Sequence, residues 1–457
     1  MYLNNKIMKT RELLFVFAAA GLISACSSDE DTPKVQPQPQ EEEEQTEQTE
    51  GSALRTLNVV ENVSTPFNAA QYAGSLTDEE QAVGSGLQDF ALRFVRESLS
   101  ASDGQENVVV SPFSASVLLS SLANGCGGQT LQEMCALLNL KVSDLTALNN
   151  YQRKVASQLG NADDSVCFLG SNALWMQYEL PVYRSFIEDS QNFYSTEVEA
   201  IDFADKAAGS TINRWCKEKT KGLIERILED GPQTCELIMA NALYFKAPWV
   251  EGFAEEATKP GTFTNQDGTK KEVQMMHRED QFFVRYAKAA NFDLAALDFG
   301  QYEYRNYSMV FGLPHEGVSL GACIEGLDAA TWNEAVSSLS TQYVDMMLPR
   351  FEVSLSQNLK PMLQKMGLTS IFDAQQADLS RLSPLPLAVS AMQQDAVLKV
   401  NEKGAEAAAV SWVGLTTSDG PGNEPKYIPF HVDRPFFFAI RENLNGNILF
   451  MGVVRRL

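Results

Sequence analysis

The chain is poor in the residues on which most catalytic sites depend. Only three of its 457 residues are histidine, namely His277, His315 and His431. It contains no H-E-x-x-H zinc motif, no G-x-x-x-x-G-K-[ST] phosphate loop and no G-x-G-x-x-G dinucleotide fingerprint. We therefore expect no metal, no cofactor and no enzymatic activity, although a Ser–His–Asp arrangement assembled only by the fold is not visible in a sequence.

Positive charge is scarce as well. The chain has 36 Lys and Arg against 59 Asp and Glu, which gives a formal net charge of -23. Binding to a phosphate backbone needs clustered Lys and Arg, so the composition argues against a nucleic-acid partner. Cysteine is limited to seven residues without a C-x-x-C motif. The six that follow Cys26 have apolar neighbours and irregular spacings, so we expect mostly buried thiols, and no pairing can be deduced.

The N-terminal apolar run, residues 13–23, is too short to span a membrane. Basic residues precede it and Ile-Ser-Ala-Cys at residues 23–26 follows, as in a secretory signal. This ending resembles the bacterial lipobox, which implies a signal peptide at residues 1–25 and lipidation of Cys26. The acidic residues 29–31 resemble a surface-export signal, or are plain linker. We expect an exported lipoprotein anchored to the outer membrane, and the first reading of residues 29–31 would place it on the cell surface.

Domain organisation follows from composition. Residues 26–62 are rich in Gln, Glu, Pro and Ser, which predicts a disordered tether. Residues 63–457 show no comparable break, which predicts one domain. Helical periodicity occurs in residues 86–99, 112–123, 130–138 and 207–220, with Ser111-Pro112 as a helix start and Thr130 and Glu133 spaced as in a capping box. Buried or alternating strand patterns occur in residues 236–245, 343–355, 435–440 and 448–454, so the fold class is α+β. Asn445-Gly446 predicts a hairpin between the last two.

One segment combines a strand pattern with the setting of a loop. Residues 402–415 read Glu-Lys-Gly-Ala-Glu-Ala-Ala-Ala-Val-Ser-Trp-Val-Gly-Leu, and turn-forming residues follow at 418–422. With a period of two, one face carries only small or aliphatic side chains, namely Ala405, Ala407, Ala409, Ser411, Val413 and Leu415. The other face carries Glu406 and Trp412. A strand that enters a packed sheet must offer a face of the first kind, so we predict that this loop can become a strand.

Ordered blocks along residues 85–457 resemble the serpins. The most specific is Ala-Asn-Ala-Leu-Tyr-Phe-Lys-Ala-Pro-Trp at residues 240–249. The other family-like blocks are residues 107–114, 122–130, 171–175, 198–203, 212–215, 220–224, 348–351, 377–380, 433–436 and 449–454. The resemblance implies three β-sheets surrounded by eight to nine helices, with an exposed reactive-centre loop.

The resemblance also implies a suicide inhibitor of endopeptidases, with serine proteases as the first class of target and cysteine proteases as the second. The protease cleaves the loop and forms an acyl-enzyme, and the loop then inserts into the main sheet. The hinge residues implied are Glu402, Gly404, Ala405, Glu406, Ala407, Ala408 and Ala409. The shutter and breach residues implied are Ser111, Ser114, Asn241, Trp249 and Gln394. Gln394 stands where the family has histidine, and it can still donate and accept hydrogen bonds.

The position of the cleavage site is ambiguous. Compared with the family's pattern, the reactive loop is about six residues longer on its C-terminal side. Counting forward from the hinge places the scissile bond at Ser418–Asp419, and counting back from Asp433 places it near Glu424. The alternatives on the hinge side are Leu415, Thr416 and Thr417. We prefer the hinge count because the inserted length sets how far the protease is carried.

The partner predicted is an endopeptidase. No Lys or Arg occurs between residues 404 and 425, which argues against a trypsin-like target. Elastase-like or subtilisin-like enzymes fit, a papain-like enzyme stays open, and Trp412 would suit a chymotrypsin-like one. We expect a monomer that touches the membrane only through its lipid anchor. The alternative is a non-inhibitory serpin that acts as a binding or chaperone protein.

Overall fold

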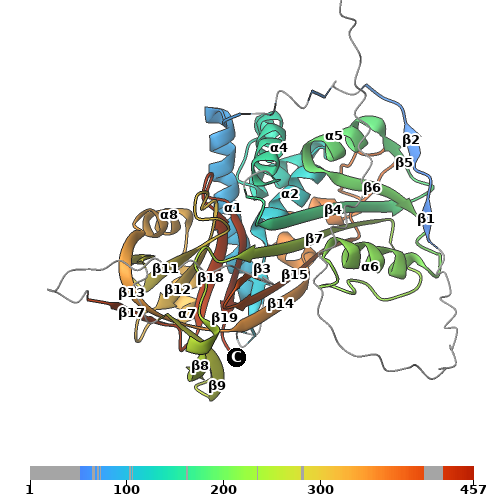
Figure 1. Cartoon of the computed structure of the whole chain (residues 1–457). Coiled ribbons are helices and arrows are strands. Elements are labelled where there is room, and N and C mark those ends of the chain that lie inside the picture. The colour runs from blue at the N-terminus through green and yellow to red at the C-terminus, as the bar shows by residue number, and fades with distance from the viewer. Residues whose placement is uncertain are drawn as a thin grey trace, which may run out of the picture. The chain divides into compact units, whose positions relative to one another are not determined.

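Three β-sheets and nine α-helices are present in the part of the chain that the computed structural model describes. This part comprises residues 52–63, 67–68, 72, 74–101, 104, 106–160, 163–233, 235–278, 283–405 and 426–457. Six of the helices lie before residue 220, and long strands dominate the rest, which agrees with the predicted α+β class (Figure 1).

The seven-stranded sheet, called the main sheet below, carries the predicted insertion site. Its strand order is β1 (Leu54–Arg55), β6 (Thr196–Ile201), β4 (Cys167–Gln177), β7 (Leu237–Pro248), β16 (Gly404–Ala405), β15 (Ala391–Asn401) and β14 (Phe351–Asn358). β4 and β7 are antiparallel, whereas β7 and β15 are parallel. Parallel neighbours need a long connection, and here about 140 residues of chain lie between the two strands.

The second sheet has ten strands. Its main path runs β3 (Val108–Val110), β19 (Ile448–Val454), β18 (Phe436–Glu442), β12 (Tyr307–Pro314), β11 (Phe292–Phe299), β10 (Phe283–Lys288), β13 (Ser340–Pro349), β9 (Lys270–Arg278) and β8 (Lys259–Thr264). Off this path, β17 (Ile428–His431) pairs with β13. A two-stranded sheet joins β2 (Asn58–Val60) and β5 (Pro181–Tyr183).

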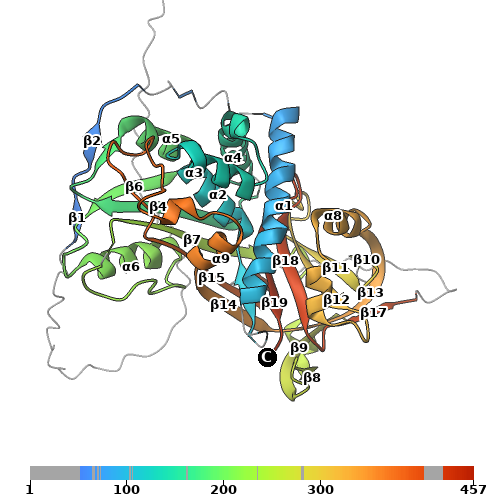
Figure 2. The ribbon, with the colours of Figure 1, turned by 180° about the vertical axis from the view of Figure 1, so that it is seen from behind.

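Helices cover the main sheet from both sides, as Figures 1 and 2 show. On one face, α6 (Ala208–Lys219) packs through Ala208 and Ile212 against Ile238 and Ala240 of β7. The opposite face meets the large core of α1 (Asp78–Ala101), α2 (Pro112–Ala123), α3 (Gly128–Leu137), α4 (Leu145–Gly160), α5 (Arg184–Tyr194) and α9 (Lys360–Lys365). The short helices α7 (Leu320–Glu325) and α8 (Ala329–Ser337) pack beside the ten-stranded sheet (Figure 1).

The predicted helix start at Ser111-Pro112 and the predicted hairpin at Asn445-Gly446 are both confirmed. Each depends on contacts between residues close together in the sequence. Ser111 is the N-cap of α2, its Oγ accepts from the Ser114 amide at 3.2 Å, and Pro112 occupies the first turn. Ten of the twelve α2 residues are buried, so this helix lies inside the protein. The predicted hairpin at Asn445-Gly446 joins β18 and β19, with Gly446 at a φ of 80°.

Two other predictions need correction. The capping box at Thr130 is wrong, because α3 begins at Gly128 and the carboxylate of Glu133 accepts from the Ser370 amide at 2.8 Å. The tether predicted for residues 26–62 ends earlier than residue 62, since Ala53 is fully buried against the core under α6. Among the described helices, none combines the length and the apolar composition needed to cross a bilayer.

Candidate functional site

The main sheet forks between β7 and β15. At one end these strands pair directly, from Ala391 opposite Ile238 to Asp395 opposite Ala242. At the other end β16 lies between them, and Ala405 pairs with Ala247 of β7 on one side and with Val400 of β15 on the other. Gly404 and Ala405, at the start of the predicted inserting strand, thus already form a short strand of this sheet.

Gly404 is required by the backbone at the mouth of the fork. Its φ of +144° is one that side-chain-bearing residues rarely adopt, and a Cβ there would lie 2.1 Å from the carbonyl oxygen of Ala247. The next residue, Ala405, is fully buried in the core shared by the two large sheets. A small side chain at residue 405 fits between the flanking strands, and a larger one has to displace them or leave the sheet.

A buried carboxylate anchors the turn that leads into β16. Glu402 is 4% exposed, and its Oε1 accepts from Arg350 Nε at 2.7 Å and from Thr258 Oγ1 at 2.5 Å. Burial by itself would raise the pKa of Glu402, but the hydrogen bonds from Arg350 and Thr258 outweigh it and lower that pKa. The carbonyl oxygen of Glu402 accepts from the Phe253 amide at 2.9 Å.

Trp249, predicted as a breach residue, holds the same turn from β7. Its indole Nε1 donates to the carbonyl oxygen of Asn401, and its backbone amide donates to that of Lys403, each at 2.9 Å. The fully buried ring stacks on Phe299 with 4.3 Å between ring centroids. Trp249 therefore fixes the backbone on both sides of Glu402.

The predicted shutter residues fall into two separate groups. Gln394 is bonded twice to the backbone of Ser111: its Oε1 accepts from the amide at 3.1 Å, and its Nε2 donates to the carbonyl at 2.8 Å. Ser111 Oγ donates to the carbonyl oxygen of Leu449 at 2.6 Å. The glutamine thus joins β15 to the start of α2. Among the described residues, no side-chain hydrogen bond joins it to Asn241, although the two residues are ladder partners.

Asn241 is bonded on the other side, toward β4. Its Nδ2 donates to Asn172 Oδ1 at 2.7 Å and to the carbonyl oxygen of Ser171 at 3.3 Å. Asn172, Arg350 and Thr258 were not among the predicted site residues. Asn172 and Arg350 lie in family-like sequence blocks, which was the available signal, whereas nothing in the sequence singles out Thr258.

The remaining predicted site residues lie outside the described part of the chain. They are Cys26, Glu406, Ala407, Ala408, Ala409, Leu415, Thr416, Thr417, Ser418 and Asp419. The described hinge therefore consists of Glu402, Gly404 and Ala405, and the roles assigned to the other residues stay predictions.

A hydrolase site finds little support in the described residues. Residues 317–321 match the G-x-S-x-G motif, which in many hydrolases carries the nucleophilic serine. Ser319, however, has ordinary extended backbone angles (φ -75°, ψ 148°) rather than those of a strained nucleophile elbow. Its Oγ accepts from the Ala322 amide as the N-cap of α7. His315 nearby is bonded to Asp293 at 2.8 Å, and no hydrogen bond between His315 and Ser319 is found among described residues.

Thiol and metal chemistry are equally unsupported. The six described cysteines are free thiols, and burial raises the pKa of Cys135, Cys235 and Cys323 to about 11 and that of Cys216 to about 12. Thiolates are the nucleophilic form, so these thiols are poor nucleophiles near neutral pH. Within the described ranges, no group of three His, Cys, Asp or Glu residues could hold a metal ion.

Comparisons with known proteins agree with this arrangement. The family model described as Serpin (serine protease inhibitor) matches residues 85–457. The chain is 32% identical over 392 residues to Iripin-2 of Ixodes ricinus, covering 83% of this chain and 94% of that protein. It is 30% identical over 365 residues to a serine protease inhibitor of Cyanea capillata, covering 78% and 94%.

Solved structures share the fold. Thyroxine-binding globulin in complex with thyroxine matches with a TM-score of 0.72 and 26% identity, covering 82% of this chain and 99% of that one. The thermophilic serpin Tengpin in its native state matches with a TM-score of 0.73 and 24% identity, covering 88% and 98%. The predicted serpin fold is confirmed, and the chain belongs to the serpin family.

Proposed function

We propose that this chain is an exported lipoprotein that inhibits serine endopeptidases by loop cleavage, acyl-enzyme trapping and insertion of the loop into the main sheet. Serpins are generally protease inhibitors and not enzymes. The observation that carries the proposal is the position of Gly404 and Ala405 between β7 and β15. Insertion of the following residues then extends a strand that has already begun.

The length of β7 suits the predicted inserting segment. Gly404 pairs with Pro248, the last residue of β7, and the pairing is antiparallel. Continuing this register residue by residue would place Leu415 opposite Leu237, the first residue of β7. The twelve residues of β7 would thus accommodate residues 404–415 and no more.

The faces of the inserted strand also match. Residues directly opposite each other in an antiparallel pair point to the same side of the sheet. Ala405 and its partner Ala247 belong to the core between the large sheets, whereas Ala240 faces α6. The same register would send the small odd-numbered residues of the segment into the core and Glu406 to the other face, between Lys246 and Lys399.

The chemistry follows from competition between two steps. The protease nucleophile would attack the carbonyl carbon of Ser418 and release the amine of Asp419, which leaves an ester or thioester on the protease. Hydrolysis of that bond frees the protease, whereas insertion traps it. Ser418 lies three residues beyond Leu415, so trapping would carry the protease to the far end of β7. Leu415, Thr416 and Thr417 are the alternative cleavage positions.

The target proposed is an elastase-like or subtilisin-like protease. Incubation of the protein with pancreatic elastase and with subtilisin should give a covalent complex that survives denaturing electrophoresis. The intact mass of the released C-terminal fragment would identify the scissile bond. Simple loop cleavage without a covalent complex across a protease panel would contradict the proposal and favour a non-inhibitory binding protein.

The location proposed is the outer membrane, with Cys26 as the lipidated residue of a bacterial lipoprotein. The support is the signal-like composition of residues 1–26. The full chain expressed in a Gram-negative host should fractionate with membranes and be released by the change Cys26→Ser. Membrane association of Cys26→Ser equal to that of the unchanged chain would contradict the anchor.

A further inference from the structure

The chain enters the domain at the end of the main sheet that lies opposite to the start of the reactive loop. Leu54 of β1 pairs with Ile201, the last residue of β6, and β6 runs parallel to β4. Because β4 and β7 are antiparallel, this end of the sheet is also where β7 begins, at Leu237. β16 lies at the other end, where β7 finishes at Pro248. We call these the tether end and the loop end, and the length of β7 separates them by about 40 Å.

Several contacts fasten the chain at the tether end. The Ala53 amide donates to Thr211 Oγ1 of α6 at 3.1 Å, and the Ala53 carbonyl oxygen accepts from the Asp202 amide at 2.9 Å. Arg55 forms ion pairs with Asp202 at 3.4 Å and with Asp205 at 2.9 Å, and β2 then pairs with β5. Only the residues before Ala53 can therefore act as a tether between this domain and a lipid anchor.

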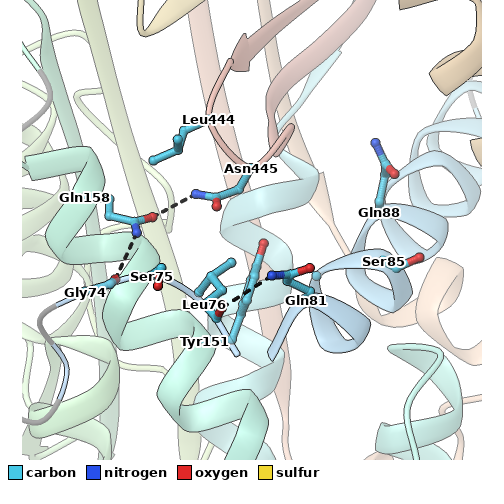
Figure 3. Close-up of a pocket in the computed structure, with 11 residues that line it drawn as sticks. Gly74, Ser75, Leu76, Gln81, Ser85, Gln88, Tyr151, Gln158, Leu444 and Asn445 are labelled. Atoms are coloured by element: carbon cyan, nitrogen blue, oxygen red, sulfur yellow. Dashed lines mark hydrogen bonds between the residues drawn. The ribbon is translucent and has the colours of Figure 1, made fainter. Parts of the chain in front are cut away.

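The surface at the tether end is hollowed. A hollow of about 620 Å³ is bordered by Phe203 after β6, by Glu236 just before β7 and by Ser390 just before β15. A second hollow, of about 530 Å³, lies between α1, α4 and the β18–β19 hairpin, and no residue of the main sheet lines it (Figure 3). A strand inserted between β7 and β15 would thus end beside the first hollow rather than in packed protein.

We propose that residues 27–52 are a spacer that leaves room for a trapped protease between the domain and the membrane. The inference rests on the proposed function, in which insertion carries the protease along β7 to the tether end. A protease that arrives there lies on the same side of the domain as the anchored chain, so the protease and the membrane compete for one space. A tether shorter than the protease would block the last part of insertion.

The lengths are compatible with this role. The chain from Cys26 to Ala53 can span at most about 90 Å, at about 3.3 Å for each residue. A compact protease of about 230 residues is roughly 45 Å across, which is half of that reach. Residues 27–52 also carry nine acidic residues against one lysine, and like charges repel one another and an anionic membrane surface. Length and charge thus both favour separation of the domain from the membrane.

The test attaches the protein to a membrane without relying on lipidation in a cell. The chain from Cys26 onward is coupled through this thiol to phosphatidylcholine vesicles that contain a maleimide lipid. Burial raises the pKa of each of the six described cysteines, so Cys26 should react first near neutral pH. Cys26→Ser is the control that should stay uncoupled.

Two altered tethers are compared with the unchanged one, each coupled and uncoupled. Deletion of residues 32–49 leaves a reach of about 30 Å, which is shorter than the protease, whereas a Gly-Ser segment of equal length in their place keeps the reach. We expect loop cleavage at equal rates in all of these proteins, because the loop end faces away from the vesicle. The stoichiometry of inhibition should rise about fivefold in the coupled deletion protein, and in no other.

Each contrary result has a distinct meaning. Equal stoichiometries for the coupled unchanged protein and the coupled deletion protein would overturn the spacer role. Slower loop cleavage in the coupled deletion protein would also overturn it, because the loop end would then lie beside the membrane. A rise in the uncoupled deletion protein would overturn it as well, by assigning the effect to the domain. If none of the uncoupled proteins traps a protease, the proposed inhibitor function itself fails, and the spacer role fails with it.

Discussion

Replacement of Ala405 by arginine tests loop insertion at the residue where the structure shows it beginning. Ala405 is fully buried between Ala247 and Val400. A guanidinium group in this core would be an unpaired buried charge, which costs several kcal/mol. The hinge can avoid that cost by leaving the sheet, at the expense of a few ladder hydrogen bonds worth about 1 kcal/mol each.

The difference between these two costs sets the magnitude. The starting state adopts the cheaper response and leaves residue 405 outside the sheet, whereas insertion has to return it and bury the charge. We expect this difference to raise the barrier to insertion by about 3 kcal/mol, so the rate of insertion should fall about 150-fold. Hydrolysis of the acyl-enzyme involves other atoms and keeps its rate. Ala405→Arg should therefore be cleaved as a substrate.

The assay is the stoichiometry of inhibition together with denaturing gels of protease mixtures. Ala405→Ser is the first control, because its side chain is small and it should still trap protease. Lys403→Arg is the second, because it places a guanidinium group two residues away on a half-exposed side chain that faces Glu255. An unchanged stoichiometry for Ala405→Arg would refute the reasoning from the buried position of residue 405.

Three further predictions concern stability, each read from thermal or urea unfolding. Glu402→Gln should lower the free energy of unfolding by about 1–2 kcal/mol at pH 7, whereas Glu352→Gln in an exposed ion pair should change it little. Because the folded-state pKa of Glu402 is lowered, its contribution to the free energy of unfolding should be lost as pH falls below about 4.5. If Glu402→Gln lost stability with falling pH to the same extent as the unchanged protein, this role would be contradicted. Gln394→Leu should cost about 1–3 kcal/mol by leaving the buried amide of Ser111 without its acceptor, while the Ser111 carbonyl keeps its bond from the Ala115 amide. An equal loss in Gln393→Leu would count against it. Asp345 is hydrogen-bonded to His277 and His431 at 2.8 Å each, and these bonds lower its pKa. Asp345→Asn should therefore reduce the fall in melting temperature below pH 4. A melting temperature that depends on pH as in the unchanged protein would exclude this role.

Local sequence signals predicted local structure well. Ser111-Pro112 begins a helix and Asn445-Gly446 makes a hairpin, because the groups that satisfy the backbone there lie within a few residues. The predicted capping box at Thr130 was wrong because the hydrogen-bond partner of its side chain is distant in the sequence. Its Oγ1 is bonded to Ser370, 240 residues away, and no local pattern records such a partner.

The shutter shows the same limit. The sequence indicated that Gln394 could replace a histidine as donor and acceptor, which holds chemically. The structure decided where those bonds go: both reach the backbone of Ser111, 283 residues away. Asn241 is hydrogen-bonded to Asn172 instead, and its side-chain carbonyl oxygen has no hydrogen-bond partner among the described residues.

The sequence alone determined the serpin family, the α+β class and the small-residue face that begins at Ala405, because these depend on residue order and period. Only the tertiary structure decided that Gly404 and Ala405 lie between β7 and β15 and that Arg350 and Thr258 donate hydrogen bonds to Glu402. The physical reason is that packing and buried hydrogen bonds join residues far apart in the chain, and only the fold chooses those partners.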